Sequence, residues 1–259
     1  MAELEALVFD VDGTLADTER DGHRVAFNRA FEDAGLDWEW DVPLYGRLLS
    51  VTGGKERIRY YLDEFNRGFA RPAALDEFIA GLHRAKTAHY MALMAEGAIP
   101  LRRGVRRLLE QARDAGIRLA IATTTTPENV SALIGSTLPA GGMDWFEVVG
   151  AGDIVPKKKP ASDIYDWVLQ KMGLSPAQVV AFEDSGHGVT SAAGAGIDCI
   201  VVTTNEYTED QDFSSASVVL DSLGDPQCAA TVRAGLPPSQ GYVDIDYLRA
   251  LLDTASAPA

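Results

Sequence analysis

Two aspartates separated by a single residue follow the first mostly apolar run of the chain. Residues 4–9 form that run, and Asp10-Val11-Asp12-Gly13-Thr14 comes directly after it. Side chains at positions i and i+2 of an extended segment point to the same side, so both carboxylates can face one ligand. Gly13 lets the backbone turn sharply after them. Such a pair can bind a divalent cation and supply both a nucleophile and a general acid. The same string also occurs in ordinary turns, so it needs supporting residues elsewhere.

Three further polar groups follow other segments of the chain. They are Thr123 after the mostly apolar strand 118–122, Lys159 after a strand expected near 153–155, and the Glu183-Asp184 pair after the strand 178–182. Ligands of an open parallel sheet bind beyond the carboxyl ends of its strands, so we expect these groups to meet Asp10 and Asp12 there. An ammonium group and a metal would offset the repulsion between an attacking carboxylate and a phosphoryl group. The set therefore favours phosphoryl transfer.

The elements that must position these residues alternate between helix and strand. Helical stripes at 105–112, 164–172 and about 187–195 precede apolar strands at 118–122, 178–182 and 198–203. This alternation predicts an α/β fold with a doubly wound, parallel-sheet, Rossmann-like core. Residues 21–97 show helical periodicity only, which predicts an inserted α-helical cap domain. We place the core at 1–15 and 98–259, with the cap at 16–97. Residues 217–220 suit an edge strand, 221–241 loops, and 244–252 a terminal helix.

Charge and composition disfavour several other classes of protein. The net charge of −15 opposes nonspecific binding to nucleic acid or to an anionic membrane. The sequence has no apolar run approaching the roughly 20 residues of a membrane span. The beginning of the chain lacks the basic region of a signal peptide, and the two cysteines lack disulfide or zinc spacing. We therefore expect a cytoplasmic protein that acts on a small molecule.

The ordered set of motifs resembles the haloacid dehalogenase superfamily, whose motifs are DxDGT, a hydroxyl residue, a lysine and an acidic pair. The resemblance covers residues 3–205, and the insertion is similar to the cap of the beta-phosphoglucomutase-like branch. It implies Asp10 as the nucleophile that forms an aspartyl-phosphate, with Asp12 as general acid and base. Thr123 would bond a phosphoryl oxygen, and Lys159 would offset its charge. For Mg²⁺ we expect the ligands Asp10 and Asp184, the backbone carbonyl of Asp12, and Glu183 as a ligand or a group behind the ligands.

The segments ATTTTPENV, PKKKPASDIY and EDSGHGVTSAAGAG are most similar to the Rubisco-associated, CbbY-type phosphatases. This likeness implies a sugar bisphosphate substrate, xylulose-1,5-bisphosphate, whose removal would protect Rubisco in the Calvin cycle. Direct contact between the two proteins is not implied. The cap would select the leaving group. Candidate substrate contacts are Glu19, Lys55, Lys86, Arg102, Arg103 and Thr125, each of which is also compatible with an ordinary surface position. Lys86 corresponds to a cap lysine of the mutases, whereas His23 lies one residue from their hinge histidine and is left out.

Several alternatives remain open at this stage. A beta-phosphoglucomutase-type isomerase would share every core residue, and a phosphatase for another small ester such as 2-phosphoglycolate would differ only in the cap. A dehalogenase would attack carbon without Mg²⁺, but Asp12 and the acidic pair favour phosphoryl chemistry. A noncatalytic binding protein would be expected to have lost a core residue, and none is lost here.

Overall fold

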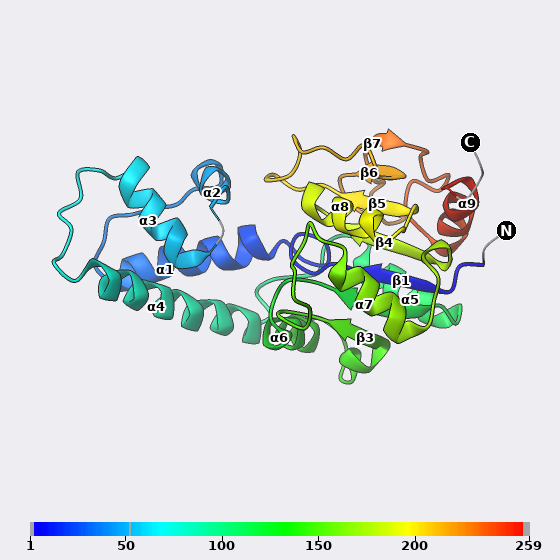
Figure 1. Cartoon of the computed structure of the whole chain (residues 1–259), viewed down its shortest axis with the longest axis horizontal. Coiled ribbons are helices and arrows are strands. Elements are labelled where there is room, and N and C mark those ends of the chain that lie inside the picture. The colour runs from blue at the N-terminus through cyan, green and yellow to red at the C-terminus, as the bar shows by residue number, and fades with distance from the viewer. Residues whose placement is uncertain (1–2, 52, 256–259) are drawn as a thin grey trace. The chain divides into compact units, whose positions relative to one another are not determined.

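The computed structural model describes residues 3–51 and 53–255 and divides them into two compact units (Figure 1). The core unit joins the chain up to Asp17 to the chain from Pro100 onward, and the cap unit runs from Thr18 to Ile99. The observed boundaries thus fall at residues 17 and 99, where the sequence placed them at 15 and 97. Residues 1–2, 52 and 256–259 belong to the predicted domains but lie outside the described residues.

Within the described residues, the core unit is built on a seven-stranded sheet in the order β3-β2-β1-β4-β5-β6-β7. Strands β1 to β6 pair in parallel and β7 pairs antiparallel with β6, so the predicted doubly wound α/β core is confirmed. The strands are β1 (Ala6–Phe9), β2 (Arg118–Ala122), β3 (Phe146–Gly150), β4 (Val179–Glu183), β5 (Ile200–Thr203), β6 (Val218–Leu220) and β7 (Val232–Gly235). Every residue of β1 and β4 is buried, which explains the apolar sequence of β1 and of the first four residues of β4.

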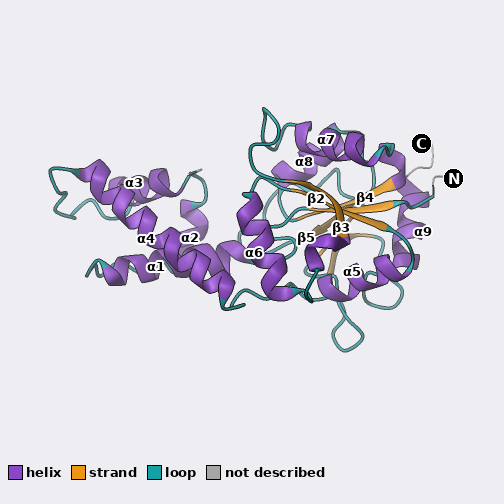
Figure 2. Cartoon of the chain, turned by 90° about the horizontal axis from the view of Figure 1, so that it is seen from below, coloured by secondary structure: helices purple, strands orange, loops and turns teal. Residues whose placement is uncertain are grey.

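Helices cover both faces of this sheet (Figure 2). On one face, α7 (Asp163–Met172) and α8 (Gly186–Gly194) pack Tyr165, Val168 and Val189 into a core shared with alternate residues of β1 and β4. On the other face, α5 (Val105–Asp114) contacts β2 and also α9 (Ile245–Ala255). Successive side chains of a strand point to opposite faces of the sheet, so the apolar side chains pack against both layers of helices.

The sequence did not predict three core elements. They are α6 (Pro127–Thr137), the edge strand β3 and the antiparallel strand β7. The middle residues of β3 are partly exposed and β7 is mostly exposed, so neither carries a long apolar run. The prediction that Lys159 directly follows a strand near 153–155 is wrong. Residues 151–162 form a loop after β3, and this loop carries Lys159.

The strand order reverses at β1, which lies between β2 and β4. Phe9 is in register with Ile121 of β2 and with Phe182 of β4. Asp10 therefore leaves the sheet beside Ala122 and Glu183, and its backbone N–H still donates to the Phe182 carbonyl at 3.0 Å. A switch point of this kind opens a crevice at the carboxyl ends of the strands, where α/β proteins bind ligands.

The cap unit is entirely helical in its described part, as the sequence predicted. A turn of π-helix (Thr18–His23) leads into α1 (Arg24–Asp33), followed by α2 (Val42–Leu48), α3 (Gly54–Glu64) and α4 (Leu75–Ala95). Aromatic rings fill its centre. Trp40 is completely buried, and its ring centroid lies 4.6 Å from that of Phe27 and 4.9 Å from that of Phe31. Across the described helices of the whole chain, none has the length and apolar character needed to span a membrane.

Candidate active site

Three buried carboxylates and one ammonium group meet at the end of β1. Ligand oxygens of Asp10, Glu183 and Asp184 lie within 4.8 Å of one another. The Lys159 ammonium donates to Asp10 Oδ1 at 2.7 Å and to Glu183 Oε1 at 2.6 Å, and only 7% of this side chain is exposed. The structure therefore brings the predicted nucleophile, lysine and acidic pair together. Water screens these charges weakly, because all four residues are largely buried.

The three carboxyl groups of this cluster outnumber its one ammonium group. Burial, together with repulsion from Asp10 and Glu183, raises the pKa of Asp184 well above its usual range. Burial likewise raises the pKa of Glu183, although Lys159 opposes that shift. Burial alone would lower the pKa of Lys159, but Asp10 and Glu183 outweigh it and raise that pKa overall. Lys159 thus remains an ammonium ion, and one positive charge faces three acidic groups.

A divalent cation fits this excess of acidic groups and the donor set, because it would stabilise their ionised forms. Glu183 Oε2 is buried and has no hydrogen-bond partner among the described residues. Hard cations such as Mg²⁺ prefer carboxylate oxygens and retain several waters, so Asp10, Glu183 and Asp184 are enough to hold one. Asp12 lies half-buried in the turn after β1, where its backbone bridges to Ala16. Its carbonyl as a ligand and its carboxyl as acid and base remain predictions.

Glu183 lies against the beginning of α8. A Cβ atom on Gly188 would stand 1.8 Å from Glu183 Oε2, so only glycine permits this approach. Ser185 caps the helix by accepting the Gly188 N–H at 3.2 Å, and the positive end of the helix favours a nearby carboxylate. The Tyr165 hydroxyl donates to Glu183 Oε1 at 2.6 Å. Neither Gly188 nor Tyr165 was expected from the sequence to be a site residue.

Asp184 is held from two sides. Gly13 has φ +81, and a Cβ atom there would lie 2.0 Å from Asp184 Oδ2, so the turn after β1 requires glycine on both counts. Asn205 donates its side-chain amide to the same Asp184 oxygen at 2.7 Å. Asn205 was also missed, although it follows the end of β5 closely. Inspection of the carboxyl end of every strand would have found it.

Two threonine hydroxyls lie between β2 and α6. Thr123 is buried, and its Oγ1 accepts the Thr125 N–H at 3.3 Å. Thr125 Oγ1 in turn accepts from the Asn129 amide at 3.1 Å. Each hydroxyl accepts a hydrogen bond here and keeps its own proton for another acceptor. This arrangement suits the predicted contact between Thr123 and a phosphoryl oxygen, and the predicted substrate contact at Thr125.

Two predicted substrate arginines have structural partners instead. All three guanidinium nitrogens of Arg102 are engaged, with the carbonyls of Gly13, Thr203, Thr204 and Asp221, the Thr203 hydroxyl and the Asp17 carboxylate. These bonds tie the turn after β1 to the ends of β5 and β6, so a substrate role at Arg102 does not fit. Arg103 is exposed, contacts Cys228 Sγ at 2.7 Å and pairs with Asp225 at 3.8 Å, so it belongs to a surface contact.

The cap unit contains its own charged cluster, which is partly buried. The Tyr45 hydroxyl donates to Glu19 Oε2 at 2.6 Å and accepts from Arg57 at 2.8 Å. Arg57 lies on α3 and was not identified from sequence, where it reads as one polar position among several. Lys55, at the start of the same helix, is exposed. The structure therefore places Glu19, but not Lys55, in this cluster.

Lys86 occupies the same cap unit and is also buried. Its ammonium contacts His23 Nδ1 at 2.8 Å and lies 5.2 Å from the Phe27 ring centroid and 5.0 Å from that of Tyr90. Burial, with the nearby cations Lys86 and Arg57, lowers the pKa of His23 to about 3. The neutral imidazole can therefore accept a hydrogen bond from Lys86 at Nδ1. His23 thus supports a predicted substrate residue.

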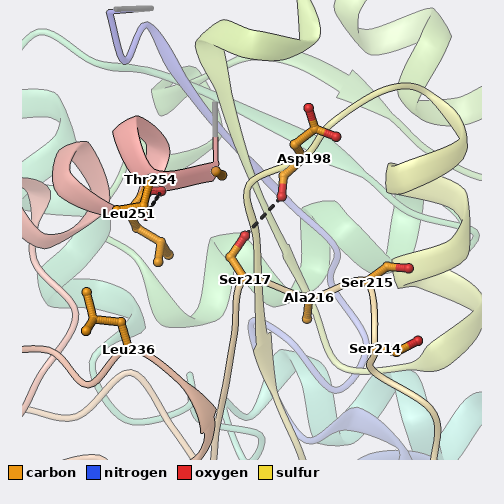
Figure 3. A pocket seen from close by; sticks show the side chains of 9 residues that line it. Asp198, Ser214, Ser215, Ala216, Ser217, Leu236, Leu251 and Thr254 are labelled. Atoms are coloured by element: carbon orange, nitrogen blue, oxygen red, sulfur yellow. Dashed lines mark hydrogen bonds between the residues drawn. The ribbon is translucent and has the colours of Figure 1, made fainter. Parts of the chain in front are cut away.

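A separate pocket lies where β5 and β6 begin, whereas the groups above follow the ends of their strands; Figure 3 shows the residues that line it. Asp198 and Ser217, which precede β5 and β6, line it together with Leu236, Leu251 and Thr254. Ser217 donates its hydroxyl to the Asp198 carbonyl at 2.9 Å. No lysine, arginine or histidine lines this pocket in the described part of the chain. We therefore locate the chemistry at the carboxyl ends of the strands.

The family model of haloacid dehalogenase-like hydrolases matches residues 4–196, and the chain belongs to that family. Fructose-1-phosphate phosphatase YqaB of Escherichia coli is 30% identical over 76% of this chain and 95% of its own length. Family and phosphatase relatives together define the chain as a phosphoric monoester hydrolase.

Within that family, the chain is similar to CbbY proteins. Protein CbbY of Rhodobacter capsulatus is 50% identical over 83% of this chain and 91% of its own length. The crystal structure of a mutant CbbY from Rhodobacter sphaeroides in complex with xylulose-(1,5)-bisphosphate is 46% identical, with a TM-score of 0.70, and covers 85% of this chain and 94% of that one. The resemblance inferred from the motifs is therefore confirmed.

Gly188 offers a direct test of how Glu183 is placed. We expect Gly188→Ala to reduce phosphatase activity by roughly tenfold or more, because the added methyl displaces the Glu183 carboxylate. Phosphate release and far-ultraviolet circular dichroism would be measured on the same preparation. Gly194→Ala is the matched control, since it lies in the same helix and its added Cβ would meet only Ser162 Cβ at 3.4 Å. Wild-type activity in Gly188→Ala would contradict this placement.

Proposed function

We propose that this protein is a Mg²⁺-dependent phosphatase that dephosphorylates xylulose-1,5-bisphosphate through an aspartyl-phosphate on Asp10. The observation that carries the mechanism is the position of Asp10 at the switch point of the sheet, with Lys159 on Oδ1 and the acidic pair beside it. A cluster that only stabilised the fold would not need three carboxylates with oxygens within 4.8 Å of one another. Such clusters are costly unless they bind a cation or a substrate.

The proposed reaction has two steps that restore the enzyme. In the first, the Asp10 carboxylate attacks phosphorus, the bond from phosphorus to the sugar oxygen breaks, and Asp12 donates a proton to that oxygen. In the second, Asp12 accepts a proton from water as the water attacks the aspartyl-phosphate, which releases inorganic phosphate and free Asp10. Lys159 offsets the repulsion between carboxylate and phosphoryl oxygens, and Thr123 donates a hydrogen bond to one of them. Bound Mg²⁺ would neutralise further charge on both partners.

Two observations support a sugar bisphosphate as the substrate. A CbbY relative at 46% identity has been crystallised with xylulose-(1,5)-bisphosphate. The cap unit of this chain also holds Arg57 and Lys86, two cations with only 9% of their surface exposed, which are suited to a second phosphate. Hydrolysis would remove an inhibitor of Rubisco, so the link to Rubisco is through the substrate.

The covalent mechanism predicts a large effect at Asp10. We expect Asp10→Asn to lower turnover by roughly a thousandfold or more while the fold is retained, because an amide oxygen is a poor nucleophile toward phosphorus. Phosphate release and thermal unfolding would be measured side by side. Asp166→Asn, at an exposed position of α7, serves as control and should leave turnover unchanged. Substantial activity in Asp10→Asn would refute the aspartyl-phosphate.

The metal assignment predicts reversible inactivation. We expect a chelator of divalent cations to abolish activity, because the repulsion among three carboxylates and the substrate is then unopposed by a metal. Addition of excess Mg²⁺ should restore the original rate, whereas Na⁺ at the same ionic strength should not. Full activity in the presence of chelator would contradict the Mg²⁺ site.

The substrate is tested by a panel of phosphate esters. With Mg²⁺ present, we expect kcat/KM to be highest for xylulose-1,5-bisphosphate among that ester, ribulose-1,5-bisphosphate, beta-glucose-1-phosphate, 2-phosphoglycolate and hexose phosphates. Formation of glucose-6-phosphate would be followed in parallel. A higher kcat/KM for another ester would replace the substrate and keep the chemistry, and glucose-6-phosphate formation would indicate a mutase.

A further inference from the structure

We propose that Tyr165 is a positioning residue that prepares Glu183 to receive the divalent cation. Tyr165 lies on α7, outside the four motifs, and is completely buried. Its hydroxyl donates to Glu183 Oε1 at 2.6 Å, and the Lys159 ammonium donates to the same oxygen at 2.6 Å. The inference rests on the proposed Mg²⁺ dependence and adds a residue that acts through Glu183.

The two donors leave the carboxylate of Glu183 with an asymmetric environment. Oε1 accepts both hydrogen bonds, whereas Oε2 has no hydrogen-bond partner among the described residues although it is buried. Two directional bonds on one oxygen restrict rotation of the carboxylate about its last bond. Oε2 therefore stays available to bind a ligand, and a divalent cation is a suitable one for a carboxylate oxygen.

The hydroxyl of Tyr165 suits this task because it can only donate at Glu183. A phenol carries one proton and bonds a carboxylate oxygen by donating it. A buried hydroxyl without a partner is costly, so the bond to Glu183 also fixes the orientation of the tyrosine.

The ring of Tyr165 contributes separately from its hydroxyl. The Lys159 ammonium lies 5.3 Å from the ring centroid, within the range of a cation–π contact. One residue on α7 therefore touches both groups that flank Asp10, through its ring and its hydroxyl. Phenylalanine would retain the ring, the volume and the contact with Lys159. Substitution by phenylalanine consequently isolates the bond to Glu183.

The test compares two tyrosines of the core unit. Tyr165→Phe removes the hydroxyl that bonds Glu183, and Tyr247→Phe removes another largely buried hydroxyl, which donates to the Leu236 carbonyl at 2.6 Å. Binding of Mg²⁺ to each enzyme without substrate would be measured by isothermal titration calorimetry, with thermal unfolding recorded alongside. We expect the Mg²⁺ dissociation constant to rise roughly 10- to 100-fold for Tyr165→Phe, as for loss of other groups that orient metal ligands, and to stay unchanged for Tyr247→Phe.

A double-mutant cycle identifies the route of the effect. If Tyr165 acts through Glu183, its substitution should weaken Mg²⁺ binding in the wild-type background and have little further effect in Glu183→Gln. Equal Mg²⁺ affinity in Tyr165→Phe and wild type, with a loss of thermal stability matching that of Tyr247→Phe, would reduce Tyr165 to a packing role and overturn the inference. Absence of Mg²⁺ binding by the wild-type enzyme would instead overturn the proposed metal itself, and this role with it.

Discussion

The site depends on the two hydrogen bonds that the Lys159 ammonium donates to Asp10 and Glu183. Three carboxylates within 4.8 Å repel one another strongly in a buried environment, and the lysine offsets only part of that repulsion. The positive end of α8 and the Asn205 amide offset part of the remaining repulsion. We propose that a divalent cation offsets the rest. An uncompensated cluster of this kind destabilises a fold, so its presence indicates a ligand that brings positive charge.

The fold meets this requirement by bringing backbone close to the carboxylates. Gly13 and Gly188 leave room where any Cβ atom would overlap Asp184 or Glu183. Arg102 holds the turn after β1 in place through hydrogen bonds to carbonyls of that turn and of the ends of β5 and β6. Its donors are engaged in these bonds, which does not fit a substrate contact. The rigid sheet thus fixes the acidic groups before any ligand binds, as electrostatic preorganisation requires.

The two units divide the chemistry between them. The core unit carries every group proposed to act on the phosphoryl group, which is common to all phosphate esters. The cap unit carries a different cluster, in which Tyr45 links Glu19 to Arg57 and His23 contacts Lys86. Cationic side chains held by neutral and acidic neighbours suit recognition of a particular ester. This division explains how CbbY proteins and a fructose-1-phosphate phosphatase can be relatives of one chain.

The motifs, their order, the doubly wound core and the helical insertion could all be predicted from the sequence. The burial of β1 and β4 on both faces and the period of the cap helices depend on residues that are close together in the chain. The sequence could not reveal β3 and β7, whose partly exposed residues lack an apolar run. Only the tertiary structure turned Arg102 into a clamp and placed Arg57 beside Tyr45. Tyr165 reads as one more residue of an apolar helical stripe, and its hydroxyl gains a role only when α7 packs against the end of β4. Periodicity reports which face of an element is buried, whereas hydrogen-bond partners come from segments distant in the chain.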